Sequence, residues 1–264
     1  MTTAEPTVTV YRSLAEAEET LRLLARYAEP WTFDIETYDG GETHDRYEGK
    51  RGKDFVLPPD DQVPSRKHVS VDPHHPHFRV RGVAIALSAD AGYWIELNGD
   101  PRGLGRRLTP RGAREVSPTA MDALAEAFGS DAEKGAYNGH FDENGLVFTG
   151  WVPRVTNRVR DGMLSAIALG DSTHENLRLP TLIVSLLGRK TYWDVDKAWM
   201  RDLPIADVAR GAVFDACYTH ELCDHLDARA AADPPTYIRW RMLDKDPARP
   251  ASPSDAEIPE DDYV

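Results

Sequence analysis

The sequence contains little of what defines several protein classes. It has only two cysteines, Cys217 and Cys223, in 264 residues, which excludes a small domain held together by disulfides. They lie six positions apart in a segment that predicts a helix, so they should not face each other, and we expect reduced thiols. No run approaches the roughly 18 apolar residues of a membrane-spanning helix, and residues 1–10 lack the basic and apolar regions of a secretory signal. We therefore expect a cytoplasmic protein without a membrane partner.

Positive charge is also scarce. The 31 Lys and Arg residues against 44 Asp and Glu residues give a formal net charge of −13. Residues 251–264 contain five of the acids and no Lys or Arg, so residues 1–250 carry −8. A protein that coats nucleic acid by bulk electrostatics is usually basic, and this charge argues against that class. It does not exclude an enzyme whose carboxylates hold cations that face the phosphates.

Several catalytic signatures are missing from the sequence. It shows no Walker loop, no G-x-G-x-x-G, no zinc-ligand spacing, no G-x-S-x-G and no internal repeat. Hydrophobic residues make up 41% of the chain and charged residues 28%, which is ordinary globular composition with ample material for a core.

Periodicity and turn residues predict strands and helices in alternation. This order predicts an α/β fold, with helices packed against a mixed central sheet. A capping box at Ser13 and Glu16 opens the first helix, and Ser117-Pro118 opens the second. The predicted strands are 7–11, 31–37, 82–87, 92–97 and 135–138, of which 82–87 and 92–97 look like a hairpin. The predicted helices are 14–28, 118–128, a segment that starts near Phe141, 161–169, 180–187 and 204–231.

Two segments interrupt this pattern. Residues 39–81 are rich in Gly, Pro and His, and 40–81 carry eight Lys or Arg and seven Asp or Glu. A loop of this length is uncommon in a compact domain and is usually functional or disordered. From Pro247 onward, Pro, Ser, Ala and acids dominate. We expect one domain over 1–246 with an inserted loop at about 40–80, followed by a disordered acidic tail at 247–264.

The predicted insertion contains two groups of residues with a potential role in binding. Its histidines offer metal ligands, although the intervening prolines and the lack of partner residues favour a solvated loop. Its basic cluster would meet a DNA backbone, but an ordinary charged loop has the same composition. The histidines are His74, His75 and His77, and the basic cluster is Arg46, Lys50, Arg51 and Lys53.

Four acids stand out by their settings. Asp34 and Glu36 are two positions apart on a predicted strand, which puts both carboxylates on one face. Adjacent carboxylates repel each other unless a cation lies between them, and oxygen-only ligands suit Mg²⁺ or Mn²⁺. A solvated acidic strand edge gives the same pattern. Asp142 lies near a predicted helix start, where it would also serve as a cap. Asp215 lies inside a predicted helix, where a solvated face is the alternative.

Taken in order, the motifs around these acids resemble a family. The segments are F-D-I-E-T at 33–37, N-G-H-F-D-E-N-G-L at 138–146, D-G-M-L-S-A at 161–166 and D-A-C-Y-T-H-E-L at 215–222. They resemble the DEDD 3′–5′ exonucleases, and most of all the proofreading exonuclease domain of family-A (polymerase I type) DNA polymerases. The resemblance covers about residues 5–230 and implies an RNase H-like fold. Four motifs in the same order are more specific than any one of them.

The resemblance implies a role for each matching residue. The four acids would ligate two divalent metal ions, Mg²⁺ or Mn²⁺, which lie about 4 Å apart in such sites and promote in-line hydrolysis. The implied substrate is a single-stranded DNA 3′ end and the implied product a 5′-mononucleotide. An aromatic residue that stacks on bases tolerates every sequence, although one of the two candidates at 192 and 193 would equally pack in the core. The implied substrate-binding residues are Thr37, Asn138, Phe141, Tyr192 and Trp193.

The sequence departs from the family at the residue that orients the attacking water. The family has a Tyr four positions before the last Asp, or a His five before it, and here these positions are Gly211 and Arg210. Glycine has no side chain to hold a water. General acid–base assistance is worth roughly 10²–10⁴-fold in rate. Either another residue supplies it or the metals act alone; the candidate replacements are Tyr218, His220 and His140.

A family-A polymerase needs several hundred residues more than this sequence contains, so we expect a stand-alone exonuclease with a role in DNA replication or proofreading. A separate DNA polymerase is then an expected partner. Such a division would suit a phage, acting in the host cytoplasm, or an actinobacterial replication system. Two alternatives stay open. One is a catalytically weak accessory of a polymerase that binds DNA ends, which Gly211 favours. The other is an RNase D-like exonuclease that acts on RNA, because nothing in the sequence reads a 2′-OH decisively.

Overall fold

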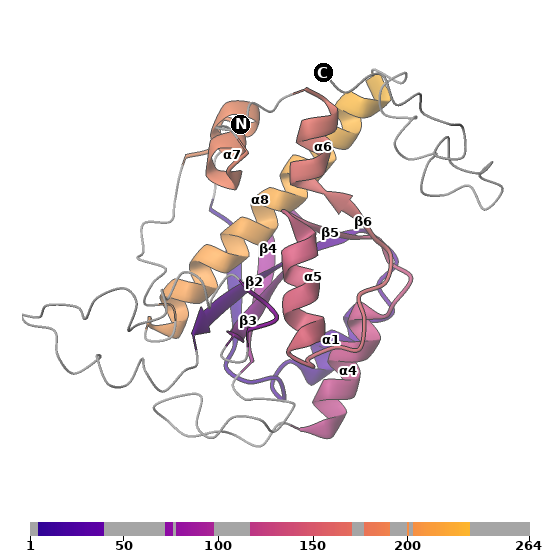
Figure 1. The fold of residues 1–264 in the computed structure, drawn as a ribbon, viewed down its shortest axis with the longest axis vertical. Coiled ribbons are helices and arrows are strands. Elements are labelled where there is room, and N and C mark those ends of the chain that lie inside the picture. Colours follow the sequence, from indigo (N-terminus) through magenta and orange to yellow (C-terminus); the bar gives the residue numbers. More distant parts are fainter. Residues whose placement is uncertain are drawn as a thin grey trace, which may run out of the picture.

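The protein folds around a six-stranded mixed β-sheet. The computed structural model describes residues 5–39, 72–75, 78–97, 117–170, 177–190, 200 and 203–232. The strand order is β1-β4-β3-β2-β5-β6 (Figure 1). The strands are β1 (Thr7–Tyr11), β2 (Trp31–Asp39), β3 (Phe78–Ala86), β4 (Ala91–Glu96), β5 (Lys134–Ala136) and β6 (Arg158–Asp161). The sheet confirms the predicted α/β class, and the antiparallel pair β3–β4 is the predicted hairpin.

Strand β2 lies in the middle of the sheet and has different partners on its two edges. Antiparallel β3 accompanies it from Thr32 to Asp39, with a register shift between Glu36 and Thr37. Parallel β5 pairs with it only at Trp31 and Thr32. Beyond Thr32, the edge of β2 that faces β5 therefore has no strand partner among the described residues, and its backbone groups can bond to side chains.

Helices cover both faces of the sheet. Figure 1 shows α8 on one side of the strands, with α5, α1 and α4 on the other. One core contains Phe33 and Ile35 of β2 together with residues of α1, α4 and α5, and another packs the opposite face against α8. The helices are α1 (Glu18–Leu24), α4 (Pro118–Phe128), α5 (Gly139–Phe148), α6 (Gly162–Ala168), α7 (Leu179–Leu187) and α8 (Ile205–Ala232).

The side chains of β2 alternate between these two cores. Phe33 and Ile35 are buried in the core beneath α1, α4 and α5. The Thr32 hydroxyl points the other way and donates a hydrogen bond of 2.8 Å to the Ala216 carbonyl of α8. The even-numbered residues that follow Thr32 share its face by the two-residue period of a strand. Helix α8 therefore lies over the face that carries Asp34 and Glu36.

A buried arginine of β3, paired with a glutamate of β4, holds the segment before α8 against the sheet. Arg81 on β3 lies 3.2 Å from Glu96 on β4, and both side chains are buried. Arg81 also donates to the carbonyls of Met200 and Leu203, the latter at 2.8 Å. Burying a charge costs free energy unless the charge is paired and hydrogen-bonded. The two hydrogen bonds from Arg81 to carbonyls meet this need and also hold the chain before α8 in place.

Some predicted boundaries differ from the structure. The Ser13 hydroxyl accepts a hydrogen bond from the Glu16 amide at 3.3 Å, but the capped segment forms a turn and α1 begins at Glu18. Helix α1 ends at Leu24, and Ala28 is exposed rather than packed as predicted. The amide that reaches the Glu16 carboxylate belongs to Arg12, so the capping box is shifted by one residue from its ideal form.

Other differences concern the strands. Strand β2 continues to Asp39 and β3 begins at Phe78, so both ends of the predicted insertion belong to the sheet. Residues 40–71 of the insertion and the predicted tail at 247–264 lie outside the described residues. Strand β6 was not predicted, because its sequence Arg-Val-Arg-Asp offers a single apolar residue.

Two expectations from composition can be compared with the structure. Cys217 and Cys223 are both free and buried in α8. Burial raises the pKa of each thiol to about 12, so both stay protonated and unreactive at neutral pH. No helix among the described residues combines the length and the apolar character needed to cross a membrane.

Candidate active site

Three carboxylates from two elements meet over the sheet. Asp34 and Glu36 on β2 and Asp215 on α8 each place an oxygen so that all three oxygens lie within 4.8 Å of one another. Glu36 is 5% exposed, and the two aspartates are half-buried. Three negative charges at this spacing repel one another in a partly desolvated site. Their oxygen ligands match the preference of Mg²⁺ and Mn²⁺.

The packing of α8 explains how this group forms. The contact between Thr32 and the Ala216 carbonyl ties the start of β2 to the turn of α8 that carries Asp215. On strand β4, which β3 separates from β2, a Cβ atom added at Gly92 would lie 2.9 Å from a Val213 side-chain carbon. The absence of a side chain at Gly92 therefore lets α8 approach the sheet closely. Asp215 is brought to the acids of β2 by this close approach.

Asp142 of α5 lies beside the group of three without belonging to it. Its Oδ1 accepts a hydrogen bond of 3.0 Å from the backbone amide of Ile35, the residue between Asp34 and Glu36. The amide of Trp31 on the same edge of β2 is bonded to the Glu133 carbonyl that precedes β5. Because β5 ends at Ala136, the Asp142 carboxylate takes the place of the next strand partner.

The electrostatic state of Asp142 follows from its position. The side chain is 3% exposed. Burial raises the pKa of Asp142 to about 8, the hydrogen bond from Ile35 opposes the shift, and the nearby charges of Glu36 and Asp161 add to it. A cation held by these acids would favour the charged form of Asp142, because a bound metal ion reverses the local effect on pKa.

The residues predicted to contact substrate have different settings. Asn138 is exposed and adopts the left-handed conformation, with φ 55° and ψ 45°, directly before α5. Phe141 packs edge-on against Phe78 with a centroid distance of 6.1 Å, so part of its ring belongs to the core. Thr37 is half-buried and follows the register shift in β2. Tyr192 and Trp193 lie outside the described residues.

The residues around the missing water-orienting tyrosine also have defined positions. Gly211 is buried on α8. Arg210 is exposed and forms an ion pair of 2.9 Å with Glu5, away from the strand that carries the acids. Of the predicted replacements, His140 is exposed, and its Nε2 lies 3.1 Å from the side-chain nitrogen of Asn144.

Tyr218 and His220 of α8 each contact other side chains. The Tyr218 ring packs against Phe214, and the Arg189 guanidinium lies 5.7 Å from its centroid. His220 is buried with one ring nitrogen 3.7 Å from the Asp224 carboxylate, and burial lowers its pKa. These contacts give no support to either residue as the replacement for the tyrosine.

One buried carboxylate close to these residues received no role from the sequence. Asp161, at the junction of β6 and α6, is 7% exposed, and its carboxylate accepts hydrogen bonds from both the α5 and the α6 starts. The available signal was an Asp at the first position of the predicted helix 161–169, where a helix-capping Asp is common. The link to α5 was invisible in the sequence, since it depends on the position of β6 beside β5.

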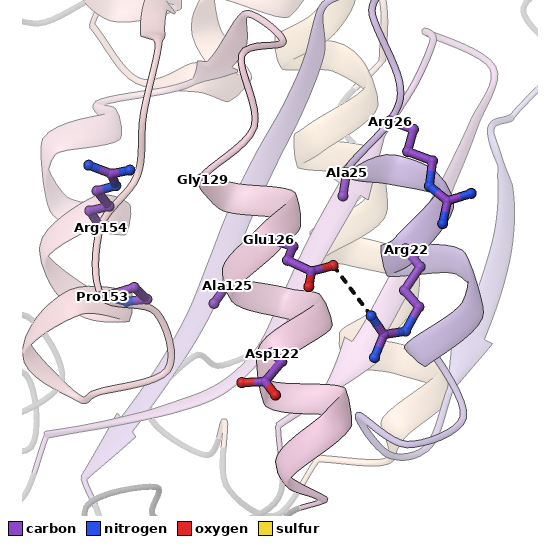
Figure 2. A pocket seen from close by; sticks show the side chains of 9 residues that line it. All are labelled: Arg22, Ala25, Arg26, Asp122, Ala125, Glu126, Gly129, Pro153 and Arg154. Atoms are coloured by element: carbon purple, nitrogen blue, oxygen red, sulfur yellow. Dashed lines mark hydrogen bonds and ion pairs between the residues drawn. The ribbon is translucent and has the colours of Figure 1, made fainter.

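A hollow elsewhere on the molecule lacks the features of an active site. It has a volume of about 630 Å³ and lies between α1, α4 and the segment at 153–154 (Figure 2). Arg22, Arg26 and Arg154 line it together with Asp122 and Glu126. Arg22 lies 3.3 Å from Glu126, so the charges in the hollow largely balance. None of the four acids described above lines it.

Similarity to known proteins appears in the structure rather than in the sequence. No protein-family model matches the chain, and no curated protein sequence matches it significantly. NrnC of Brucella melitensis, in a structure bound to pGG, superposes with a TM-score of 0.54 at 15% identity over 90% of both chains. The Nibbler EXO domain of Aedes aegypti gives 0.52 at 16% identity, over 89% of this chain and 94% of that one.

A third similar structure is the catalytic core of RRP6 from Trypanosoma brucei. It gives a TM-score of 0.55 at 12% identity, over 92% of this chain, which spans 54% of that core. These likenesses, all at low identity, confirm the predicted RNase H-like fold. The resemblance to the DEDD exonucleases, and the narrower one to the polymerase I proofreading domain, stay predictions.

Proposed function

We propose that this protein is a metal-dependent 3′–5′ exonuclease that releases 5′-mononucleotides from single-stranded DNA 3′ ends. The convergence of Asp34, Glu36 and Asp215, with Asp142 bonded to the amide between the first two, carries the proposal. These four acids come from three elements far apart in the sequence. A solvated acidic strand edge would not require a buried aspartate from α5 as well.

The donor set fits divalent metal ions. The four side chains offer only carboxylate oxygens, and two of them, Glu36 and Asp142, are buried. When bound, two Mg²⁺ or Mn²⁺ ions would supply activation of the attacking water and stabilisation of the leaving 3′ oxygen. NrnC, whose fold this chain shares, has a structure with bound Mg²⁺ and another bound to pGG, which supports a metal and a nucleic-acid substrate here.

The chain itself supplies positioning of these ligands. Asp34 and Glu36 are held on a central strand, and α8 fixes Asp215 through its contacts with β2 and β4. The backbone amide of Ile35 holds Asp142. Preorganised ligands need little rearrangement when charge develops in the reaction.

The substrate-binding roles are part of the proposal. Asn138 is exposed at the entrance to α5, and its side chain is available to a nucleotide at the 3′ end. Thr37 follows Glu36 directly, and Phe141 directly precedes Asp142. We assign Tyr192 and Trp193 to base stacking, which suits an enzyme that accepts every sequence. A separate DNA polymerase, of phage or actinobacterial type, is the proposed partner in replication or proofreading.

The test uses 5′-labelled single-stranded DNA and RNA of one sequence, each with Mg²⁺, Mn²⁺ or EDTA. We expect the DNA to shorten from its 3′ end in either metal and to stay intact in EDTA. Asp215→Asn should slow digestion at least 100-fold, because a metal ligand is lost. The matched control is Asp207→Asn, an exposed acid in the first turn of the same helix, which should digest at the wild-type rate.

Other outcomes would redirect the assignment. Digestion that persists in EDTA, or in Asp215→Asn, would contradict the metal-dependent mechanism. Faster digestion of RNA would identify an RNA exonuclease of the RNase D type. Binding of 3′ ends without digestion in either metal would indicate the accessory function that the buried Gly211 favours, since a glycine cannot orient a water.

A further inference from the structure

The carboxylate of Asp161 joins two helix starts. Its Oδ1 accepts hydrogen bonds of 3.1 Å from the amides of both Met163 and Leu164, which caps α6. Its Oδ2 accepts a hydrogen bond of 2.9 Å from the amide of Gly139, the first residue of α5. A fourth amide, that of Asn138, donates a hydrogen bond of 3.3 Å to Oδ1. A simple N-cap satisfies the amides of one helix, whereas this carboxylate satisfies amides of two.

The turn that Asp161 holds is conformationally demanding. Asn138 adopts the left-handed conformation, which costs free energy for a residue with a side chain and persists only where the surroundings enforce it. A Cβ atom added at Gly139 would lie 2.8 Å from the Ala136 Cβ and 3.0 Å from Arg158. The chain therefore leaves β5 by a sharp and crowded turn, and the hydrogen bonds to Asp161 fix its direction.

Arg158 on β6 adds a second connection to the same helix. Its Nε donates a hydrogen bond of 2.8 Å to Glu143 of α5, and its Nη1 lies 3.5 Å from Asp161 Oδ2. Glu143 is the neighbour of Asp142. The first turn of α5 is thus held by Asp161 at its start and by Arg158 one turn later.

We infer that Asp161 is a positioning residue for Asp142, which rests on the proposed function of the acid site. Asp142 lies three residues after Gly139, so the entry angle and register of α5 set where its carboxylate meets the Ile35 amide. Loss of the Asp161–Gly139 hydrogen bond frees α5 to shift. Removal of a residue that orients a ligand typically costs 10- to 100-fold in metal affinity or activity.

The two oxygens of Asp161 permit a selective substitution. Asp161→Asn keeps one oxygen, which still caps α6 through Met163 and Leu164. Its amide nitrogen then faces two donors, the Gly139 amide and the Arg158 guanidinium, and can accept from neither. The matched control is Ser117→Ala, which removes the N-cap of α4, where the Ser117 hydroxyl accepts from the Ala120 amide. Both variants lose a cap contact, but only the first disturbs α5.

The closing experiment measures three quantities in the full chain: amide hydrogen exchange of Ile35 by NMR in EDTA, the Mn²⁺ dissociation constant, and kcat and KM on single-stranded DNA. For Asp161→Asn we expect Ile35 exchange to speed up at least 10-fold while that of Ala84, in the adjacent ladder, stays unchanged. Mn²⁺ affinity and kcat should fall 10- to 100-fold, with KM within threefold. Arg158→Met should give a smaller change in the same direction.

Each result tests either the positioning role of Asp161 or the proposed exonuclease function. If Asp161→Asn matches Ser117→Ala in Ile35 exchange, Mn²⁺ affinity and kcat, then Asp161 is only a helix cap and the inference fails. If the wild-type chain digests no substrate, the exonuclease proposal fails, and the Ile35 exchange still reports whether Asp161 holds α5. Recovery of the Asp161→Asn rate at high Mn²⁺ would support displacement of a metal ligand.

Discussion

At the scale of single residues, one charged side chain lies in the interior among backbone carbonyls and an aromatic ring. Lys134 of β5 is fully buried, and its ammonium donates hydrogen bonds of 2.7 Å and 3.0 Å to the carbonyls of Ser130 and Ala132. It also lies 5.3 Å from the Trp31 ring centroid. Burial lowers the pKa of Lys134 to about 8, because desolvation disfavours the charged ammonium.

Stability should therefore rise with pH between about 8 and 10.5. In this window the unfolded chain holds a proton on Lys134 that the folded protein has released, so unfolding takes up a proton and becomes less favourable as pH increases. Below pH 8 both states are protonated and the burial penalty is complete. Urea unfolding of wild type and Lys134→Met at pH 7.5, 9 and 10 measures this, and we expect the free energy of unfolding of the wild type to rise relative to that of Lys134→Met as the pH increases. A constant difference across the series would contradict the lowered pKa.

The face on which a side chain lies can be predicted from the sequence where a single strand or helix determines it. The two-residue period placed Asp34 and Glu36 on one face, and they do share it. The meeting with Asp215 came from the family resemblance, since periodicity says nothing about which helix covers which strand. The bond from Ile35 to Asp142 could not be predicted, because it depends on the early end of β5.

At the scale of elements, local signals fixed some boundaries and missed others. Helix α4 begins and ends as predicted, since its Ser117 cap, Pro118 and Gly129 each act within one turn. Helix α1 is shorter than its apolar spacing predicted. Strand β6 was missed because pairing with β5, rather than its own charged sequence, makes it a strand. Whether a short segment forms a strand depends on the strand it pairs with, and the local sequence does not identify that partner.

Helix α5 packs on β2 at a contact that can be tested by a double-mutant cycle. A Cβ atom added at Gly145 would lie 2.3 Å from Ile35 Cδ1. Gly145→Ala gains about 1 kcal/mol of helix propensity but overpacks the core at a cost of about 1–3 kcal/mol. Ile35→Val removes the clashing methyl group and costs about 1 kcal/mol alone. We expect the double variant to be more stable than the two single effects predict, by about 1 kcal/mol.

Chemical unfolding of the four proteins in EDTA gives this coupling energy directly. Purely additive effects would show that α5 accommodates the methyl group by a shift that leaves Ile35 in place.

At the scale of the whole molecule, the acid site opposes the stability of the metal-free fold. The sheet and α8 bring Asp34, Glu36 and Asp215 within 4.8 Å, and their repulsion is balanced by packing elsewhere. In EDTA, Asp34→Asn should raise Tm by about 2–4 °C, which corresponds to about 1 kcal/mol for a domain of this size. With Mn²⁺ the order should reverse, because an ion that binds only the folded state stabilises it.

Differential scanning calorimetry of wild type, Asp34→Asn and the exposed-acid control Asp207→Asn measures both effects. A Tm of Asp34→Asn in EDTA that equals or lies below that of the control would show that the acids do not strain the metal-free protein.

The hydrogen bond that holds Asp142 has a consequence for how the site tolerates mutation. Its donor is the backbone amide of Ile35 rather than a side chain. Every amino acid except proline carries that amide, so substitutions at position 35 leave the donor in place. The side chain at position 35 can then vary to suit the core beneath α5 while the Asp142 carboxylate, at the edge of β2, keeps its hydrogen bond. The packing of the core and the placement of the Asp142 carboxylate are thus separated at a single residue, and only proline at position 35 would remove the donor itself.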